Sequence, residues 1–331
     1  MLRAAIVGFG RWGQHLVQCA QGSNRIRFVG AVVRDPRRAS KELSTYTSYE
    51  EALADADIDA VVLATPHSVH AEQILQAARA KKHVFTEKPF TLTRRSAEEA
   101  VRACAQAGVT LAVGYNWRFQ PALQEIRRML QDGRLGKLLH MEGNFCGPSA
   151  YRYGGEHWRQ SREEGPAGGM TGRGVHVVDA MLYLGGKIAG VQAQSVRRAQ
   201  ETGIDDTTSM LFRFSSGATG YLGTVIATAE TWRLQVFGAR GWAEVGGIGH
   251  LDTWRLRYSL VNQANPFAEG QVETMAFPAL STERAELEHF AEAALARRPL
   301  AVAGGDEIHG VAVLEAIVDS ANRAATVRIE P

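Results

Sequence analysis

The sequence contains few cysteines, and no spacing motif pairs them. Cys19, Cys104 and Cys146 are the three in 331 residues, and they lie far apart without a Cys-x-x-Cys spacing. This distribution argues against a disulfide framework and against a cysteine-based zinc cluster, and it fits a reducing compartment. We interpret the three cysteines as packing residues.

Long hydrophobic runs, a leader-like start and an excess of one charge are also missing. No run approaches the length that spans a bilayer, and the N-terminus shows no charged region followed by an apolar region and a cleavage site. The 37 basic and 35 acidic residues nearly cancel, which argues against binding to nucleic acid or an anionic membrane. We expect a cytoplasmic protein that acts on a small molecule.

The first third of the chain alternates between short apolar runs and amphipathic segments of helical length. Such alternation is typical of an α/β fold in which helices cover both faces of a parallel sheet. The predicted strands are residues 28–33, 59–64, 83–86 and 110–113, and the predicted helices include residues 69–80 and 96–107.

Beyond residue 137 the pattern changes to longer strands with alternating side chains. Met210, Phe212 and Phe214 alternate with Leu211 and Arg213, which predicts an antiparallel sheet with one covered face. We expect Trp232, Trp242 and Trp254 to cover its apolar face. The pattern further predicts helices at 121–131 and 175–184, helices beginning at Ser281 and Asp306, a strand at 326–329 and a long functional loop at 147–174.

A glycine-rich turn follows the apolar run of residues 4–7 and begins a helical pattern. It comprises Gly8, Phe9, Gly10, Arg11, Trp12 and Gly13. In a dinucleotide-binding turn, the first glycine allows the tight strand-to-helix connection and the second lets the backbone approach a pyrophosphate. The third allows helix and strand to pack closely. The turn therefore predicts binding of NAD or NADP at a helix N-terminus.

Lys88 follows the predicted strand 83–86, within the sequence Glu87-Lys88-Pro89. Ligands of open α/β sheets bind at the carboxyl ends of the strands. A lysine at this edge can donate a hydrogen bond to a substrate hydroxyl and stabilise the negative charge that develops on its oxygen. The alternative is a surface lysine paired with Glu87.

An ordered set of motifs resembles the Gfo/Idh/MocA oxidoreductases over essentially the whole length. The motifs are Gly8-x-Gly10-x-x-Gly13, Thr65-Pro66-His67-x-x-His70, Glu87-Lys88-Pro89, Arg118-Phe119-x-Pro121, Gly168-Gly169 and His176-x-x-Asp179. The resemblance implies a Rossmann domain at residues 1–120. It also implies a substrate-binding and oligomerisation domain at 121–331 with a large, mainly antiparallel open sheet, and a homodimer or homotetramer formed through that sheet.

The same resemblance implies NAD(P)-linked hydride transfer to or from a sugar, cyclitol or related polyol. Lys88 would be catalytic, with a bond to Pro89 that is often cis, and His176 would lie opposite the nicotinamide. Where the family has Asp-x-Gly-x-His, this chain has Gly172 at the aspartate position. His176 can still act as a general base because imidazole titrates near neutral pH. A structural histidine is the alternative.

Further residues are candidates for binding the cofactor or the substrate. Arg173 can hold an anionic group or be paired, and Asp179 can bind a substrate hydroxyl or make a structural bond. Candidate cofactor contacts besides the turn are Thr65, Pro66, His67, His70, Glu87 and Lys88, and candidate substrate contacts are Tyr115, Arg118, Trp158, Arg159, Arg173, His176 and Asp179. We expect no metal site from His67, His70 and His176, because no carboxylate or cysteine cluster accompanies them.

The end of the second predicted strand bears on the choice between NAD and NADP. Val33 occupies the place where an acidic residue normally accepts the ribose hydroxyls, although Asp35 is close enough to compete or to cap a helix. Arg34, Arg37 and Arg38 can together bind a 2′-phosphate, or form a basic helix start that faces water. NADP is mildly favoured.

The sequence thus predicts a two-domain NAD(P)-dependent dehydrogenase or reductase. Two alternatives stay open. One is a hydrolase or lyase that uses bound NAD only transiently, and the other is a nicotinamide-binding regulatory protein that has lost the chemistry.

Overall fold

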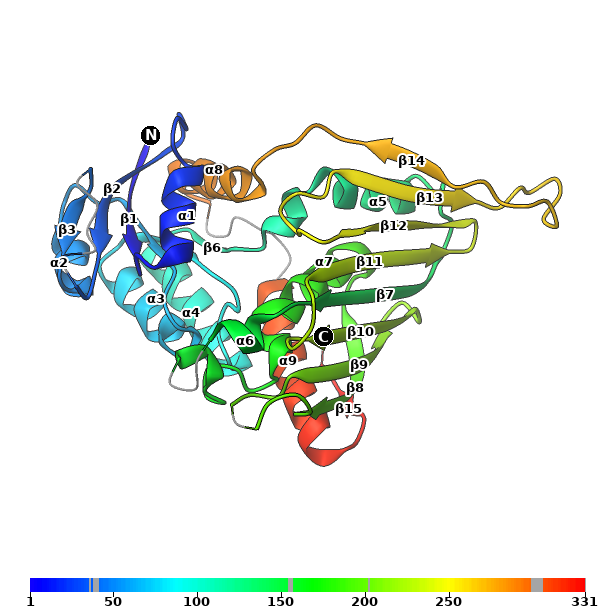
Figure 1. The fold of residues 1–331 in the computed structure, drawn as a ribbon. Coiled ribbons are helices and arrows are strands. Elements are labelled where there is room, and N and C mark those ends of the chain that lie inside the picture. Colours follow the sequence, from blue (N-terminus) through cyan, green and yellow to red (C-terminus); the bar gives the residue numbers. More distant parts are fainter. Residues whose placement is uncertain (36, 38–41, 154–156, 202, 299–305, 331) are drawn as a thin grey trace. The chain divides into compact units, whose positions relative to one another are not determined.

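The computed structural model describes residues 1–35, 37, 42–153, 157–201, 203–298 and 306–330. The chain forms two compact units, whose elements are labelled in Figure 1. The first unit comprises Met1–Asn116 and Ser281–Val311, and the second comprises Trp117–Leu280 and Ala312–Pro331. The predicted division at residue 120 does not include the return of residues 281–311 to the first unit.

The first unit contains the predicted parallel sheet. Its six strands lie in the order β3-β2-β1-β4-β5-β6, and every neighbouring pair is parallel. The strands are β1 (Leu2–Val7), β2 (Ile26–Val32), β3 (Ser44–Tyr46), β4 (Ala60–Leu63), β5 (His83–Thr86) and β6 (Leu111–Val113). From β1 to β3 each new strand is added on one side of β1, and from β4 to β6 each is added on the other side. Ligands of such folds usually bind where the strand order reverses, which here is between β1 and β4.

Helices cover both faces of this sheet, as predicted. Ile74 of α3 and Ala97 of α4 belong to one buried cluster, whereas Leu16 of α1 and Phe290 of α8 belong to the other. The helices are α1 (Arg11–Cys19), α2 (Tyr49–Ala54), α3 (His70–Arg79), α4 (Arg94–Ala107) and α8 (Thr282–Leu295). Ser281 caps α8 as expected, since its side chain accepts the Arg284 N–H.

The second unit contains a mixed sheet in which only β7 and β10 pair in parallel among the described residues. Its order is β14-β13-β12-β11-β7-β10-β9-β8-β15. The strands are β7 (Leu138–Cys146), β8 (Ile188–Val196), β9 (Thr207–Phe214), β10 (Thr219–Val225), β11 (Thr231–Gly238), β12 (Gly241–Gly247), β13 (Arg255–Leu260), β14 (Glu273–Ala276) and β15 (Val327–Arg328).

Helices pack on one face of the mixed sheet. A Cβ atom at Gly143 of β7 would touch Val177 and Met181, so α7 lies directly on this strand. The Ala193 N–H of β8 donates to Ser320 Oγ of α9 at 2.8 Å. The longer helices of this part of the chain are α5 (Pro121–Gln131), α7 (Val175–Gly185) and α9 (Asp306–Arg323), of which α9 begins within the first unit.

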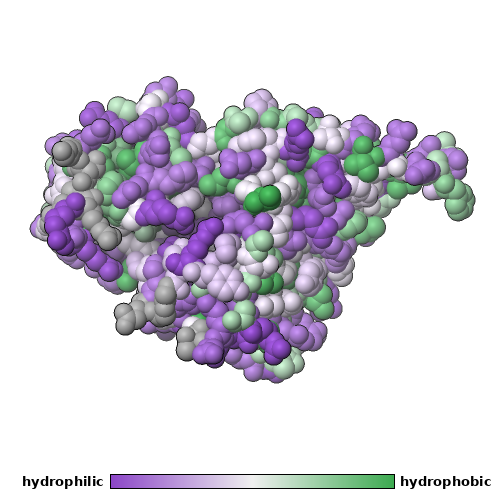
Figure 2. Space-filling view, in the orientation of Figure 1, coloured by the Kyte–Doolittle hydropathy of each residue, from purple (hydrophilic) through white to green (hydrophobic). Residues whose placement is uncertain are grey.

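The opposite face of the mixed sheet is open. Leu211 is 57% exposed, whereas its neighbours Met210 and Phe212 are buried, which confirms the predicted alternation. One expectation was wrong: Trp232 is buried with the covered face, but Trp242 occupies the alternate register and is only half-buried. Hydrophilic residues predominate on the surface seen in Figure 2, and apolar residues occur there in small separate spots.

The predicted long loop at residues 147–174 contains more regular structure than expected. It includes α6 (Ser149–Arg152), the 3-10 helix η4 (Trp158–Gln160) and a π-helix, η5 (Met170–Gly174), that runs directly into α7. The other short helices are η2 (His67–Val69) and η3 (Asn116–Phe119). No helix among the described residues is long and apolar enough to cross a membrane.

Candidate functional site

The glycine turn connects β1 to α1 in a way that explains each of its three glycines. Gly8 has a φ of +93°, and a Cβ atom there would lie 2.5 Å from the carbonyl oxygen of Ala64. A Cβ atom at Gly13 would overlap the carbonyl oxygen of Gly8. At Gly10, by contrast, a Cβ atom would meet nothing within 4 Å. Packing therefore requires the outer glycines, and the middle one borders open space.

The N-terminus of α1 is suited to an anion. Gly10 is its N-cap and provides no side-chain hydrogen bond, and no acidic residue lies in the first turn. The first N–H groups of a helix have no intrahelical partner, and the helix dipole favours negative charge there. Together with the space at Gly10, this turn fits the pyrophosphate of a dinucleotide.

A buried carboxylate links this turn to Lys88. The Trp12 indole N–H donates to Glu87 Oε1 at 2.6 Å, and Lys88 Nζ lies 3.8 Å from Glu87 Oε2. The Lys88 ammonium also lies 6.0 Å from the centroid of the Trp12 ring. The side chain of Lys88 is only 18% exposed, so the alternative of a surface lysine paired with Glu87 is correct in the pairing but not in the surface position. Its peptide bond to Pro89 is cis, as the resemblance implied.

Glu87 is sensitive to the charge of its neighbour. Burial raises the pKa of the Glu87 carboxyl, while the Lys88 ammonium and the Trp12 N–H oppose that shift. A buried carboxylate is stable in its charged form only when such partners remain in place. The charge states of Glu87 and Lys88 are therefore linked.

His70 joins two loops at the same edge of the parallel sheet. Its side chain is fully buried, with Nδ1 2.9 Å from the carbonyl oxygen of Pro89 and Nε2 3.2 Å from that of Thr65. His67 lies in η2, also buried, with its ring centroid 6.1 Å from that of His70. His70 thus connects the segment after Lys88 to the end of β4, the strand-to-helix junction predicted for both histidines.

The residues after β2 occupy the place predicted for the cofactor's ribose. Val33 is buried, and its N–H donates to the Tyr46 carbonyl. Arg37 pairs with Asp35, with Nε 2.9 Å from Oδ1, and its backbone N–H donates to the same oxygen. Arg34 is exposed. Arg38 lies outside the described residues.

In the second unit, His176 lies within an aromatic cluster. It is 5% exposed on the first turn of α7, and its ring stacks on Trp117 with centroids 5.3 Å apart. The Trp117 indole N–H donates to Nδ1 of His250 at 3.2 Å. Because an indole nitrogen only donates, Nδ1 of His250 carries no proton in this arrangement. His250 was missed in the sequence because a single histidine in a loop after β12 has no recognisable pattern.

Two predicted substrate contacts bind each other instead. Arg118 and Asp179 are both buried and form a bidentate pair, with N–O distances of 2.6 to 3.0 Å. This geometry favours the structural alternative for Asp179, since breaking a buried pair leaves an uncompensated charge. Arg173 is also paired: its Nη1 donates to the Cys146 carbonyl at 3.0 Å and to Glu230 at 3.1 Å.

Gly172 itself is not required by the fold. Its φ is not positive, and a Cβ atom there would have no neighbour within 4 Å. The absence of the family's aspartate therefore reflects neither backbone strain nor crowding at this position.

The remaining candidates lie elsewhere. Tyr115 is buried in the core of the first unit. The Arg159 guanidinium lies 4.1 Å from the centroid of the Trp158 ring, so these two residues contact each other in η4. A cavity of about 370 Å³ in the second unit is lined by Tyr151, Tyr153, Gln160, Ala199, Gln200, Glu201 and Gly203. None of the predicted substrate contacts lines it.

Comparison with protein families matches both parts of the chain. Residues 2–115 match the model described as "Oxidoreductase family, NAD-binding Rossmann fold", and residues 123–244 match the "GFO/IDH/MocA C-terminal domain". A crystal structure of aldose-aldose oxidoreductase from Caulobacter crescentus, in complex with glycerol, superposes with a TM-score of 0.87 and 25% identity, covering 99% of each chain.

Characterised and uncharacterised relatives were also found. The uncharacterized oxidoreductase YrbE of Bacillus subtilis is 31% identical over 61% of this chain and 60% of its own. The 2,7-anhydro-N-acetylneuraminate hydratase of Escherichia coli is 29% identical over 57% of this chain and 50% of its own. D-xylose 1-dehydrogenase (NADP(+)) 2 of Haloferax volcanii is 28% identical over 90% of both.

The alignments to the first three relatives span only 60%, 50% and 42% of those proteins. The two family models, however, together cover most of this chain, and all the motifs quoted above except Arg118-Phe119-x-Pro121 lie within the matched residues. The chain belongs to the Gfo/Idh/MocA family of NAD(P)-binding oxidoreductases.

Proposed function

We propose that this protein is an NAD(P)-dependent dehydrogenase or reductase acting on a CH–OH group of a sugar, cyclitol or related polyol. The observation that carries the proposal is Lys88, held by buried Glu87 beside the dinucleotide turn. The similarity to a D-xylose dehydrogenase over 90% of both chains supports a sugar-like substrate.

The first unit would hold the cofactor through the Gly8–Gly13 turn and the N–H groups of α1. The nicotinamide, when bound, supplies the centre that exchanges a hydride with the substrate carbon. Lys88 donates a hydrogen bond to the substrate oxygen and stabilises the negative charge that develops on it. Glu87 Oε2 lies 3.8 Å from the ammonium and attracts it, and the ammonium in turn favours the charged form of the buried carboxylate.

His176 is the proposed group that moves the hydroxyl proton. Its ring is held by stacking on Trp117. Arg118, next to Trp117 in the chain, and Asp179, three residues after His176, are bound to each other. A histidine fixed in this way can accept a proton without the help of a carboxylate, because imidazole titrates near neutral pH.

The cofactor is proposed to be NADP in preference to NAD. Val33 offers no carboxylate to the ribose, and Asp35 is bound by Arg37. Arg34 is exposed at the end of β2, where a guanidinium can bind a 2′-phosphate.

A second candidate is a non-redox reaction that uses the bound nucleotide transiently. It is favoured by one observation, the 29% identity to a hydratase over about half of each chain. In that case the purified protein would retain its nucleotide and would convert substrate without net reduction.

Titration of nucleotide-free protein with NADH and with NADPH tests the cofactor proposal. Trp12 lies in the turn, so tryptophan quenching reports on binding. We expect NADPH to bind at least about tenfold tighter, or about 1.4 kcal/mol, and Arg34→Gln to remove the difference. Equal affinities would contradict the preference for NADP, and binding of neither nucleotide would contradict the oxidoreductase.

Replacing the proposed catalytic lysine tests the reaction. We expect Lys88→Met to abolish turnover while nucleotide affinity stays within about tenfold, since the lysine acts on charge that develops in the transition state. The exposed Lys187→Met is the matched control and should keep turnover. Near-normal turnover of Lys88→Met would contradict the mechanism.

A further inference from the structure

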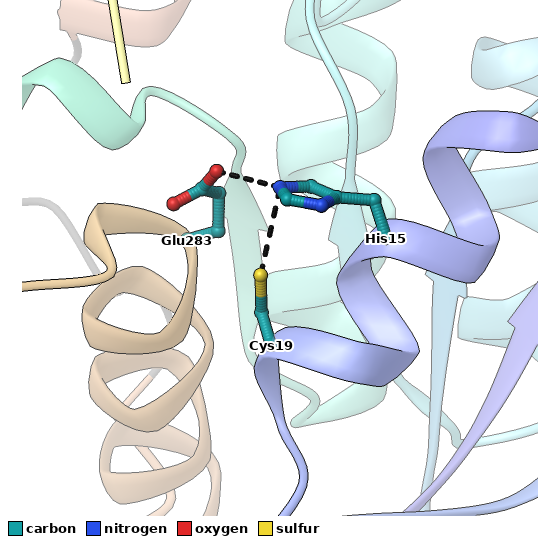
Figure 3. Close-up of side chains that lie close together, drawn as sticks. All are labelled: His15, Cys19 and Glu283. Atoms are coloured by element: carbon teal, nitrogen blue, oxygen red, sulfur yellow. Dashed lines mark hydrogen bonds and ion pairs between the residues drawn. The ribbon is translucent and has the colours of Figure 1, made fainter. Parts of the chain in front are cut away.

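Three potential metal ligands gather in the first unit, outside the proposed catalytic residues. His15 and Cys19 lie one helical turn apart on α1, and Glu283 lies in the first turn of α8, as Figure 3 shows. One ligand atom from each lies within 4.8 Å of the others. No other such group of three is present among the described residues.

The distances are close to those around a tetrahedral metal ion. His15 Nε2 is 2.8 Å from Glu283 Oε1 and 3.5 Å from Cys19 Sγ. A zinc ion with bonds of about 2.3 Å to sulfur and about 2.0 Å to nitrogen and oxygen separates its ligand atoms by about 3.3 to 3.5 Å. Small side-chain movements would therefore suffice to admit the ion.

Glu283 is already oriented for this role. Its other oxygen, Oε2, accepts hydrogen bonds from the hydroxyls of Ser281 and Thr282 at 3.2 Å each. Thr282 Oγ1 in turn accepts from the Asn116 amide at 3.0 Å. Such outer hydrogen bonds fix the orientation of ligating carboxylates in metal sites. They leave Oε1 directed at His15.

Exposure and charge also suit a cation. The Glu283 side chain is 5% exposed and that of His15 is 35% exposed, so the cluster is partly accessible to solvent. A water molecule can occupy the fourth position, as in zinc sites with three protein ligands. The Glu283 carboxylate and a Cys19 thiolate would balance a divalent charge, although the nearby Arg284 reduces the attraction.

We propose that His15, Cys19 and Glu283 bind a divalent transition-metal ion of the zinc class. Imidazole, thiolate and carboxylate together select zinc or cobalt over magnesium or calcium. The ion would bridge α1 to α8 and so fix the helix whose N-terminus forms the dinucleotide turn. This site is independent of the hydride-transfer proposal, and it differs from the expectation that the sequence contains no metal site.

Cobalt binding to the full-length protein tests the site, after treatment with a chelator. We expect one equivalent of Co²⁺ to bind with tetrahedral visible bands and a thiolate-to-cobalt charge-transfer band. Cys19→Ser should lose the charge-transfer band, and both Cys19→Ser and His15→Gln should weaken binding at least tenfold. Cys146→Ala, in the second unit, is the matched control and should keep all bands.

A second measurement avoids substitution altogether. We expect one equivalent of Zn²⁺ to protect Cys19 from alkylation at least tenfold, by peptide mass spectrometry, and to leave Cys104 and Cys146 unchanged. The proposal is overturned if no saturable binding occurs up to about 1 mM metal, if the charge-transfer band survives in Cys19→Ser, or if Zn²⁺ gives Cys19 no protection.

Discussion

At the scale of single residues, buried Glu87 links the position of Lys88 to that of the glycine turn. Oε1 of Glu87 accepts from the Trp12 indole, and Oε2 lies near the Lys88 ammonium and accepts from the Lys88 backbone N–H at 3.3 Å. Burial disfavours the charged form of Glu87 and raises the pKa of its carboxyl, and the Lys88 ammonium opposes that shift. The indole donor comes from the glycine turn itself, and it ties the position of Lys88 to that of the turn.

Gly172 offers a test of the altered family motif. A Cβ atom at Gly172 would meet nothing within 4 Å, so there is room for an aspartate side chain. Residues 172 and 176 are four apart, and residues at this spacing on a helix share one face. We expect Gly172→Asp to fold normally and to shift the acid limb of the kcat/KM profile to higher pH, because a nearby carboxylate stabilises the charged imidazole of His176.

The matched control for that experiment is Gly172→Asn, which adds the same volume without charge. Its pH profile should coincide with that of the unsubstituted protein. Equal shifts in both variants, or no shift in either, would show that residue 172 does not act on the proton-transferring group.

At the scale of secondary-structure elements, His83 connects β5 to β6 and makes their pairing depend on pH. The Thr110 N–H donates to Nδ1 of His83 at 2.9 Å, which requires that nitrogen to be unprotonated. Burial lowers the pKa of His83, and Arg297 lowers it further, while Asp59 opposes them. The folded state therefore takes up the proton less readily than the unfolded chain.

Because the folded state binds this proton less readily, protonation of His83 at low pH favours the unfolded chain. The contribution of His83 to stability is complete above the unfolded pKa of about 6.5 and is lost as the pH falls below it. The slope from this one group is at most about 1.4 kcal/mol per pH unit. Urea unfolding between pH 5 and 8 measures it. We expect His83→Asn, which keeps an acceptor without titrating, to reduce the pH dependence, and an unchanged slope would contradict the assignment.

Elements with a strong local pattern could be predicted from the sequence, and those without one could not. β4 is the continuous apolar run Ala60–Leu63, and α4 and α8 begin at capping residues, Thr93 and Ser281. β3 is three residues long and largely exposed, so it has no apolar signature.

The candidate site likewise contains some residues whose positions could be predicted from the sequence and others whose contacts could not. The glycine turn and Lys88 follow predicted strands, so their neighbourhood could be inferred from the rule that ligands bind at the carboxyl edge. The bidentate pairing of Arg118 with Asp179 and the meeting of His15 with Glu283, 268 residues apart, depend on tertiary structure. No local spacing encodes either contact.

At the scale of the whole molecule, the open face of the mixed sheet is the proposed contact between copies of the chain. A row of paired residues crosses this face, and it contains Leu211 beside Tyr221, Tyr221 beside Glu142, and Glu244 beside Arg257. Leu211 is 57% and Tyr221 is 39% exposed in the single chain. The apolar side chains of Leu211 and Tyr221, beside the charged side chains of Glu142, Glu244 and Arg257, suit a specific self-association.

Light scattering on size-exclusion chromatography tests this proposal. We expect the unsubstituted protein to be a dimer or tetramer and Leu211→Arg to shift it toward smaller species, because a buried unpaired charge is costly. Leu295→Arg, at the equally exposed end of α8, is the control and should keep the assembly. A monomeric parent protein, or an unchanged Leu211→Arg assembly, would contradict the proposal.

The return of residues 281–311 to the first unit bears on how the protein is made. Leu287, Phe290, Ala291 and Ala294 of α8 belong to one buried cluster with Ile6, Val62 and Phe85, whose strands are synthesised more than 200 residues earlier. Until α8 leaves the ribosome, one face of the nascent parallel sheet lacks this cover and exposes apolar residues that favour aggregation. The nucleotide-binding half is thus completed only near the end of translation, and the two units cannot be cut apart at residue 120 as independent modules.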